Sequence, residues 1–83
     1  MSSFNLPNFG SRPILDGGGH SVGRISADGG IELGEIHGRL NFDGRVLRAD
    51  REIGGAGFMG LRIQGLGPYQ RIVEGLDGNF HIQ

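Results

Sequence analysis

The chain has 83 residues, eight arginines against nine carboxylates, and a net charge of −1. A chain of this length forms one domain. Its near-neutral charge argues against a nonspecific nucleic-acid binder, which needs a clear basic excess. There is no cysteine, so disulfides and thiolate metal sites are excluded. No apolar run approaches the roughly 20 residues of a membrane span. We therefore expect neither nucleic acid nor a membrane as the partner.

The glycine content is unusually high, at 18 of 83 residues, whereas about 7% is common. Each glycine loses additional backbone entropy on folding, and a domain this small buries only roughly 60% of its unfolded surface. Small proteins usually compensate with disulfides, a metal or oligomerisation. We therefore expect the protein to form a homo-oligomer or to join a larger protein assembly.

The segment 1–13 differs from the rest of the chain. It carries two prolines and three apolar side chains, Phe4, Leu6 and Phe9, without a clear period. We interpret it as an extended N-terminal arm that precedes a single all-β domain at 14–83. The arm either covers one end of its own core or docks on a neighbouring subunit, so its three apolar residues are candidate interaction residues.

Four Asp-Gly dipeptides punctuate the remainder of the chain, at 16–17, 28–29, 43–44 and 77–78. Asp-Gly between alternating apolar residues is typical of a β-hairpin, because the primed turns need positive φ. Helical periodicity is poor throughout, and glycine recurs too often to favour a helix. The sequence predicts an all-β fold, a small antiparallel barrel or two-sheet sandwich of six to seven short strands.

Three of these hairpins have a predicted register. A three-residue loop at 28–30 places Ile25 opposite Leu33. A two-residue turn at 77–78 places Glu74 opposite His81. Gly34 is the expected site of a bulge or bend that resets the side-chain alternation. A further strand is expected at 58–64, with Met59, Leu61 and Ile63 facing inward.

The middle hairpin yields a candidate interaction surface. A two-residue turn at 43–44 places Ile36, Leu40, Phe42 and Leu47 on an inner face. The outer face then carries the apolar Val46 and five polar residues: His37, Arg39, Asn41, Arg48 and Asp50. In this register Arg39 lies opposite Arg48, and like charges opposed across a ladder are unfavourable. The face is either solvated and softened by Asp50, or a docking point for an anion or a neighbour's carboxylate.

No catalytic, cofactor or metal motif is convincing. The string from Gly55 to Gly60 matches G-x-G-x-x-G, but a strand-like run follows it, whereas the dinucleotide fingerprint needs a helix there. We interpret 54–57 as a loop or a closely approached bend. The three histidines at positions 20, 37 and 81 are too scattered for a metal site, and no serine lies in a nucleophile context. We expect a protein that is not an enzyme and needs no cofactor.

Two functional classes agree with these features. The first is a structural or assembly protein that acts through self-association or docking on a larger particle, for example a virion decoration or tail component. The alternative is a small carbohydrate- or peptide-binding module. Tryptophan is absent and there is one tyrosine, whereas such sites usually use aromatic platforms with a polar handle. A glycan ligand therefore has little support, and the assembly class is favoured.

Overall fold

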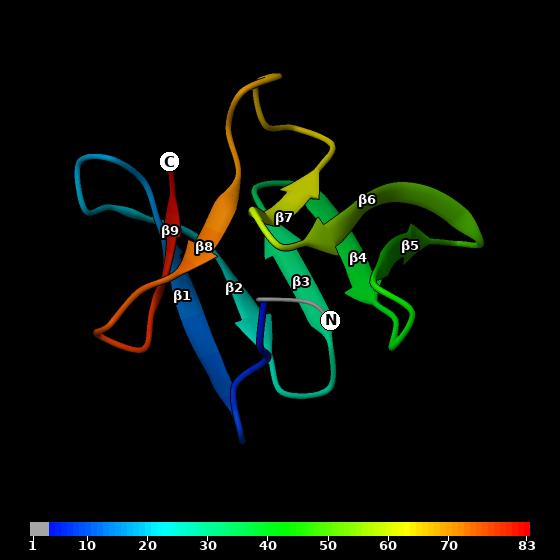
Figure 1. Cartoon of the computed structure of the whole chain (residues 1–83), viewed down its shortest axis with the longest axis horizontal. Helices are drawn as coiled ribbons and strands as arrows, with labels where there is room; N and C mark the ends of the chain where they lie inside the picture. Colours follow the sequence, from blue (N-terminus) through cyan, green and yellow to red (C-terminus); the bar gives the residue numbers. More distant parts are fainter. Residues whose placement is uncertain (1–3) are drawn as a thin grey trace.

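The computed structural model describes residues 4–83, so the first three residues of the predicted arm lie outside the described part (Figure 1). It contains nine strands and, within 4–83, no helix. The strands are β1 (Ser11–Leu15), β2 (Ser21–Ser26), β3 (Gly30–Leu33), β4 (Ile36–Leu40), β5 (Arg45–Arg48), β6 (Arg51–Gly57), β7 (Gly60–Ile63), β8 (Ile72–Glu74) and β9 (Phe80–Ile82). The all-β prediction is confirmed, whereas the predicted count of six to seven strands is wrong.

The strands form a closed barrel in chain order. Consecutive strands pair antiparallel, and β1 closes the barrel by pairing with β9 in parallel, with Ile14 opposite Phe80. Closure pairs the backbone N–H and C=O groups of the two edge strands, which an open sheet would expose to other chains. Residues 4–83 include no helix long and apolar enough to cross a membrane.

The barrel interior is filled by alternate side chains from the strands, as a pleated sheet requires. Ten apolar residues are buried there: Phe4, Ile14, Ile25, Ile31, Leu33, Val46, Leu61, Ile63, Ile72 and Phe80. No polar or charged side chain in the described part is buried with them. The N-terminal segment contributes to this core, because the ring of Phe4 stacks on Phe80 with centroids 5.2 Å apart.

The glycine-rich segment 54–57 is part of strand β6, so its interpretation as a loop or bend is wrong. Gly54 lies between Val46 and Ile63 in the inward-facing row. A Cβ at Gly54 would overlap the carbonyl oxygen of Arg62. Glycine therefore lets the strands approach closely on the inside of the barrel.

The predicted strand 58–64 is shorter than expected. Phe58 and Met59 form the turn between β6 and β7, and Met59 is 53% exposed. Only Leu61 and Ile63 of the predicted inward set are buried. The inward assignment of Met59 is therefore wrong, because the two strands turn there.

Three of the Asp-Gly dipeptides form the last two residues of three-residue loops, and these loops have the same hydrogen bonds. The loops are 27–29, 42–44 and 76–78, and the residue before each loop accepts a hydrogen bond from the backbone N–H of the loop glycine. Each glycine has φ between 83° and 97°. Each aspartate Oδ1 accepts a hydrogen bond from the backbone N–H two residues later. This is the pattern of a type I turn followed by a bulge residue in the left-handed region.

This loop design makes all three predicted registers wrong. Ile25 pairs with Ile31 rather than Leu33, Leu40 pairs with Val46 rather than Leu47, and Glu74 pairs with Phe80 rather than His81. In the last two hairpins the shift is one residue, which moves side chains to the opposite face. Val46 is consequently buried inside the barrel, and Phe42 is fully exposed in its loop.

Two other connections have a different design. Asp16 precedes the loop 17–19, and its Oδ1 accepts backbone hydrogen bonds from Gly18 and His20. Gly34, the expected bulge or bend, is the first residue of a two-residue turn in which Leu33 pairs with Ile36. Gly34 has a φ of 61°, which lies in the left-handed region that glycine adopts most readily.

The turn between β5 and β6 holds two non-glycine residues in the left-handed region, Ala49 at φ 50° and Asp50 at φ 69°. Asn-Gly is the preferred pair for this two-residue turn. We expect the double substitution Ala49→Asn and Asp50→Gly to stabilise the barrel by about 1 kcal/mol, because it relieves backbone strain. Thermal unfolding should show an increase in Tm of roughly 4–8 °C. Ala27→Gly, at a position without positive φ, is the control and should not raise the Tm. An unchanged Tm in the double variant would contradict the idea that Ala49 and Asp50 are strained.

Candidate functional site: an apolar end of the barrel

Five parts of the chain meet at one end of the barrel. They are the N-terminal segment 4–10 and the connections 27–29, 41–44, 58–59 and 75–79, which precede or join strands at that end. Most of them lie in the lower half of the view in Figure 1. We call this the apolar end, because its connections present large apolar side chains to solvent.

Five large apolar residues are exposed at the apolar end: Phe9, Phe42, Phe58, Met59 and Leu76. The side chains of Phe42 and Leu76 are as exposed as in an extended peptide, at 106% and 111%. Among residues 4–83, the opposite end shows one comparable residue, Tyr69. Single exposed apolar residues are common, but their concentration at one end is typical of an interaction surface.

The turns themselves do not require these residues. Ala27, Phe42 and Leu76 occupy the same first position of three loops that have the same hydrogen bonds. Because alanine suffices in the first loop, the large side chains of Phe42 and Leu76 are not needed to form the other two. The formation of these turns therefore does not explain the two large side chains.

Backbone contacts hold the parts of this end together. The N–H of Ala27 donates to the carbonyl of Gly10, and the N–H of Ala56 donates to the carbonyl of Gly44. The N-terminal segment and the loop 41–44 also enclose a groove of about 360 Å³. Its apolar lining residues are Phe4, Leu6, Leu40, Phe42 and Ala56. Of the five exposed apolar residues, Phe42 lines this groove.

The three apolar residues of the predicted arm have different environments. Phe4 is 7% exposed and stacks on Phe80 inside its own barrel, and Leu6 packs against the same core. Phe9 remains 85% exposed. Residues 4–10 therefore cover one end of their own core, and of the three predicted interaction residues Phe9 remains largely accessible.

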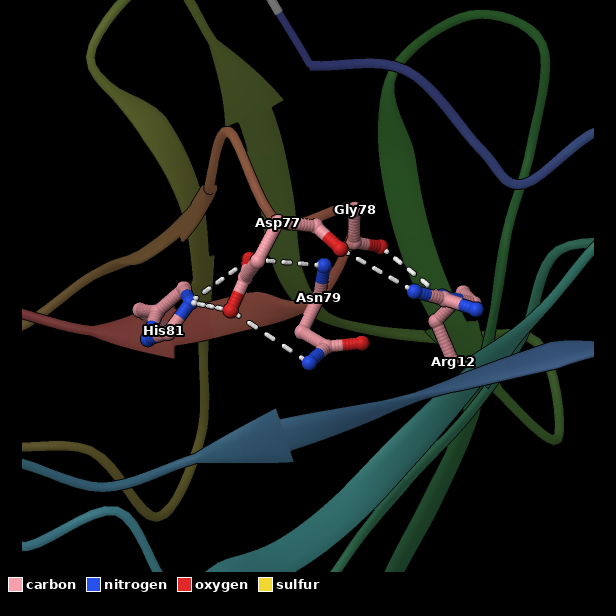
Figure 2. A network of polar contacts seen from close by, with 5 residues as sticks. All are labelled: Arg12, Asp77, Gly78, Asn79 and His81. Atoms are coloured by element: carbon pink, nitrogen blue, oxygen red, sulfur yellow. Dashed lines mark hydrogen bonds and ion pairs between the residues drawn. The ribbon is translucent and has the colours of Figure 1, made fainter.

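A polar network orders the last loop of the apolar end (Figure 2). The carboxylate of Asp77 contacts Nε2 of His81 at 3.0 Å and accepts hydrogen bonds from the backbone and side chain of Asn79. The guanidinium of Arg12 reaches from β1 and donates to the carbonyls of Asp77 and Gly78. The hydrogen bond from His81, followed by that from the Asn79 N–H, holds the pKa of Asp77 below its ordinary value of 3.8. This network fixes the loop that presents Leu76.

The other two loop aspartates also have cationic partners. Asp28 lies 3.8 Å from the guanidinium of Arg39, which also donates to the Asp28 carbonyl. Asp43 pairs with Arg45 at 3.0 Å. The backbone N–H and then the side chain of Arg45 lower the pKa of Asp43. The rim of the apolar end therefore carries carboxylates and guanidinium groups beside each other.

The lowered pKa of Asp77 predicts an acid-dependent loss of stability. A carboxyl whose pKa is lower in the folded state stabilises the fold above its unfolded pKa, and this contribution is lost as pH falls through the folded value. We expect Asp77→Asn to lower the free energy of unfolding at pH 7, and the difference from the wild type to shrink below pH 3.8. Urea unfolding at pH 7 and at about pH 3 measures both. A difference that stays constant between the two pH values would exclude this role of the carboxylate.

The predicted polar surface of His37, Arg39, Asn41 and Arg48 is not assembled as expected. Arg39 pairs with Leu47, so the Arg39–Arg48 opposition is wrong; the loop has three residues instead of two. Arg48 instead faces Arg51 across the next turn. His37 lies 3.5 Å from Glu32, and the backbone N–H of Asn41 donates to the carbonyl of Arg45. These four residues therefore belong to different local contacts.

Other residues that the sequence analysis considered for a site make local structural contacts. His81 faces Val73 in the sheet and contacts Asp77 rather than Glu74. The segment from Gly55 to Gly60 forms part of the β6–β7 hairpin instead of a strand followed by a helix. Within residues 4–83, no three histidine, aspartate or glutamate side chains lie close enough to hold a metal ion.

No family model matches the chain, and neither the curated proteins nor the solved structures give a match.

Proposed function

We propose that this protein is a non-enzymatic assembly module that binds a second copy of itself through the apolar end. The observation that carries the proposal is the concentration of Phe9, Phe42, Phe58, Met59 and Leu76 at one end of the barrel. Water contact with large apolar side chains is unfavourable, and mutual burial of two such ends removes it.

The exposed area is of the size that a stable interface needs. An aromatic side chain buries about 150–250 Å², so the three exposed phenylalanines offer on the order of 500 Å². Met59 and Leu76 bring the apolar area toward the about 800 Å² that each partner contributes to a standard interface.

The charges at the rim favour an identical partner. A two-fold interface uses the same surface on both subunits and must be complementary to itself. Carboxylates beside guanidinium groups meet this requirement, because rotation about a two-fold axis can place groups of opposite sign opposite each other. An anionic lipid surface would instead favour a basic excess around the apolar residues.

Sedimentation equilibrium of the wild-type chain tests the proposal. We expect a reversible dimer whose population rises with protein concentration. A chain that remains monomeric into the millimolar range would overturn the proposal.

A further inference from the structure

One of the exposed aromatic rings at the apolar end lies beside a groove. Phe42 is 106% exposed, and it forms part of the wall of the groove between the N-terminal segment and the loop 41–44. The other four exposed apolar residues of this end do not line the groove. Phe42 therefore places a projecting aromatic ring next to a hollow in the same surface.

The groove has the size and the chemistry to hold an aromatic ring. Its volume is about 360 Å³, whereas an apolar cavity of about 150 Å³ can hold a benzene molecule. Its walls are mainly apolar, because Phe4 belongs to the core and Leu6 and Leu40 pack against that core. Asp28 and Asn41 are its polar lining residues. Burial of a ring in this groove would remove water from the apolar walls.

Phe42 does not fill the groove that it lines. Its side chain is as exposed as in an extended peptide, and backbone hydrogen bonds hold the loop that carries it. The N–H of Gly44 donates to the carbonyl of Asn41, and the carbonyl of Gly44 accepts from the N–H of Ala56. A loop that is already ordered loses little entropy when a partner buries its side chain. The ring is thus positioned to enter a groove on another molecule.

We infer that two copies of the chain exchange Phe42, so that each ring enters the groove of the other copy. This inference rests on the proposed self-association and names its central contact. A two-fold interface repeats every contact, so insertion of one Phe42 requires the reciprocal insertion of the other. Because the ring and the groove are adjacent, both insertions lie next to the symmetry axis. Aromatic anchors at the centre of an interface, in well-packed pockets, stabilise association most.

Two variants separate the ring from the groove. Phe42→Ala removes the ring and leaves the groove open, whereas Ala56→Leu fills the groove from its own wall and leaves the ring. In sedimentation equilibrium each variant alone should dimerise at least about tenfold more weakly than the wild type, since neither homodimer has an intact insertion. An equimolar mixture should associate more tightly than either variant alone, because the ring of the Ala56→Leu copy fits the open groove of the Phe42→Ala copy.

Phe9→Ala is the matched control, because it removes a ring that is 85% exposed at the same end but does not line the groove. It should weaken association less than Phe42→Ala does. An isotope-filtered NMR spectrum of a dimer with one labelled copy identifies the contact directly. We expect intermolecular contacts between the ring protons of Phe42 and the methyl groups of Leu6 and Leu40. A ring that closed its own groove would give these contacts within one copy alone.

The results distinguish a failure of this exchange from a failure of self-association. The exchange alone is overturned if the wild type dimerises but the mixture associates no more tightly than its components, or if Phe42 contacts the partner outside the groove. A wild type that stays monomeric overturns both proposals. Circular dichroism establishes that each variant is folded. If Ala56→Leu does not fold, Leu6→Phe fills the groove from the N-terminal segment and replaces it in the mixture.

Discussion

Replacement of Phe4 by alanine is expected to destabilise the barrel by about 3–5 kcal/mol, the usual cost of removing a buried phenylalanine. Phe4 is 7% exposed and stacks on Phe80, so its removal opens a cavity at the apolar end of the core. A domain of 83 residues has a total stability of roughly 4–12 kcal/mol. The substitution therefore removes a large part of the stability of the fold.

Phe9→Ala is the matched control for this prediction. Phe9 belongs to the same segment but is 85% exposed, so the change in monomer stability should stay within about 0.5 kcal/mol. Urea unfolding at a concentration where the chain is monomeric measures both variants. Phe4→Leu, which retains apolar volume, should show a smaller loss if the alanine variant does not fold. Equal stability of the Phe4 and Phe9 variants would contradict the packing of residues 4–10 on their own barrel.

The double substitution Phe42→Ser and Leu76→Ser is expected to have the largest effect on association. Truncation of an interface hot spot costs about 2 kcal/mol or more, so two of them should raise the dimer dissociation constant by about 10²- to 10³-fold. The fold should persist, because both side chains are fully exposed and their loops rely on backbone and aspartate hydrogen bonds.

Tyr69→Ser is the control for the double substitution. Tyr69 is 86% exposed but lies at the opposite end of the barrel. Sedimentation equilibrium of the three proteins should show weakened association in the double variant alone. If Tyr69→Ser weakens association as much as the double variant, the interface is not at the apolar end.

The all-β fold could be predicted from the sequence, but the register could not, because Asp-Gly has two uses. It can form both central residues of a two-residue turn, or the last two residues of a three-residue loop. The two alternatives differ by one residue and exchange the faces of the sheet. Val46 was the signal in the middle hairpin: it was the one apolar residue on the predicted outer face, and it is fully buried.

Strand β6 was not predicted, because glycine has no side chain that could reveal the alternation of a β-strand. From the sequence, Gly54 and Gly55 are interpreted as part of a loop or bend. Gly54 is instead required where β6 approaches β7 on the inside of the barrel. The order of the strands around the barrel depends on nonlocal pairing, above all the parallel closure of β1 on β9. No local sequence pattern predicts that contact.

The apolar end could be predicted only in part. Phe9 was a candidate from the composition of the N-terminal segment, whereas Phe42 and Met59 were assigned to the core. Recognising the site requires knowing that alternate connections lie at the same end of a closed barrel. One local signal was available: the residue before Asp-Gly is alanine in one loop but Phe42 and Leu76 in the others.

The most direct test of self-association through the apolar end is a dilution series of ¹H–¹⁵N NMR spectra of the wild-type chain. Backbone signals of the loops 41–44 and 75–79, and of Phe9, should shift with concentration, whereas those of the opposite end around Tyr69 should not. Concentration-dependent shifts confined to the opposite end, or spectra that do not change over the whole range, would contradict the account.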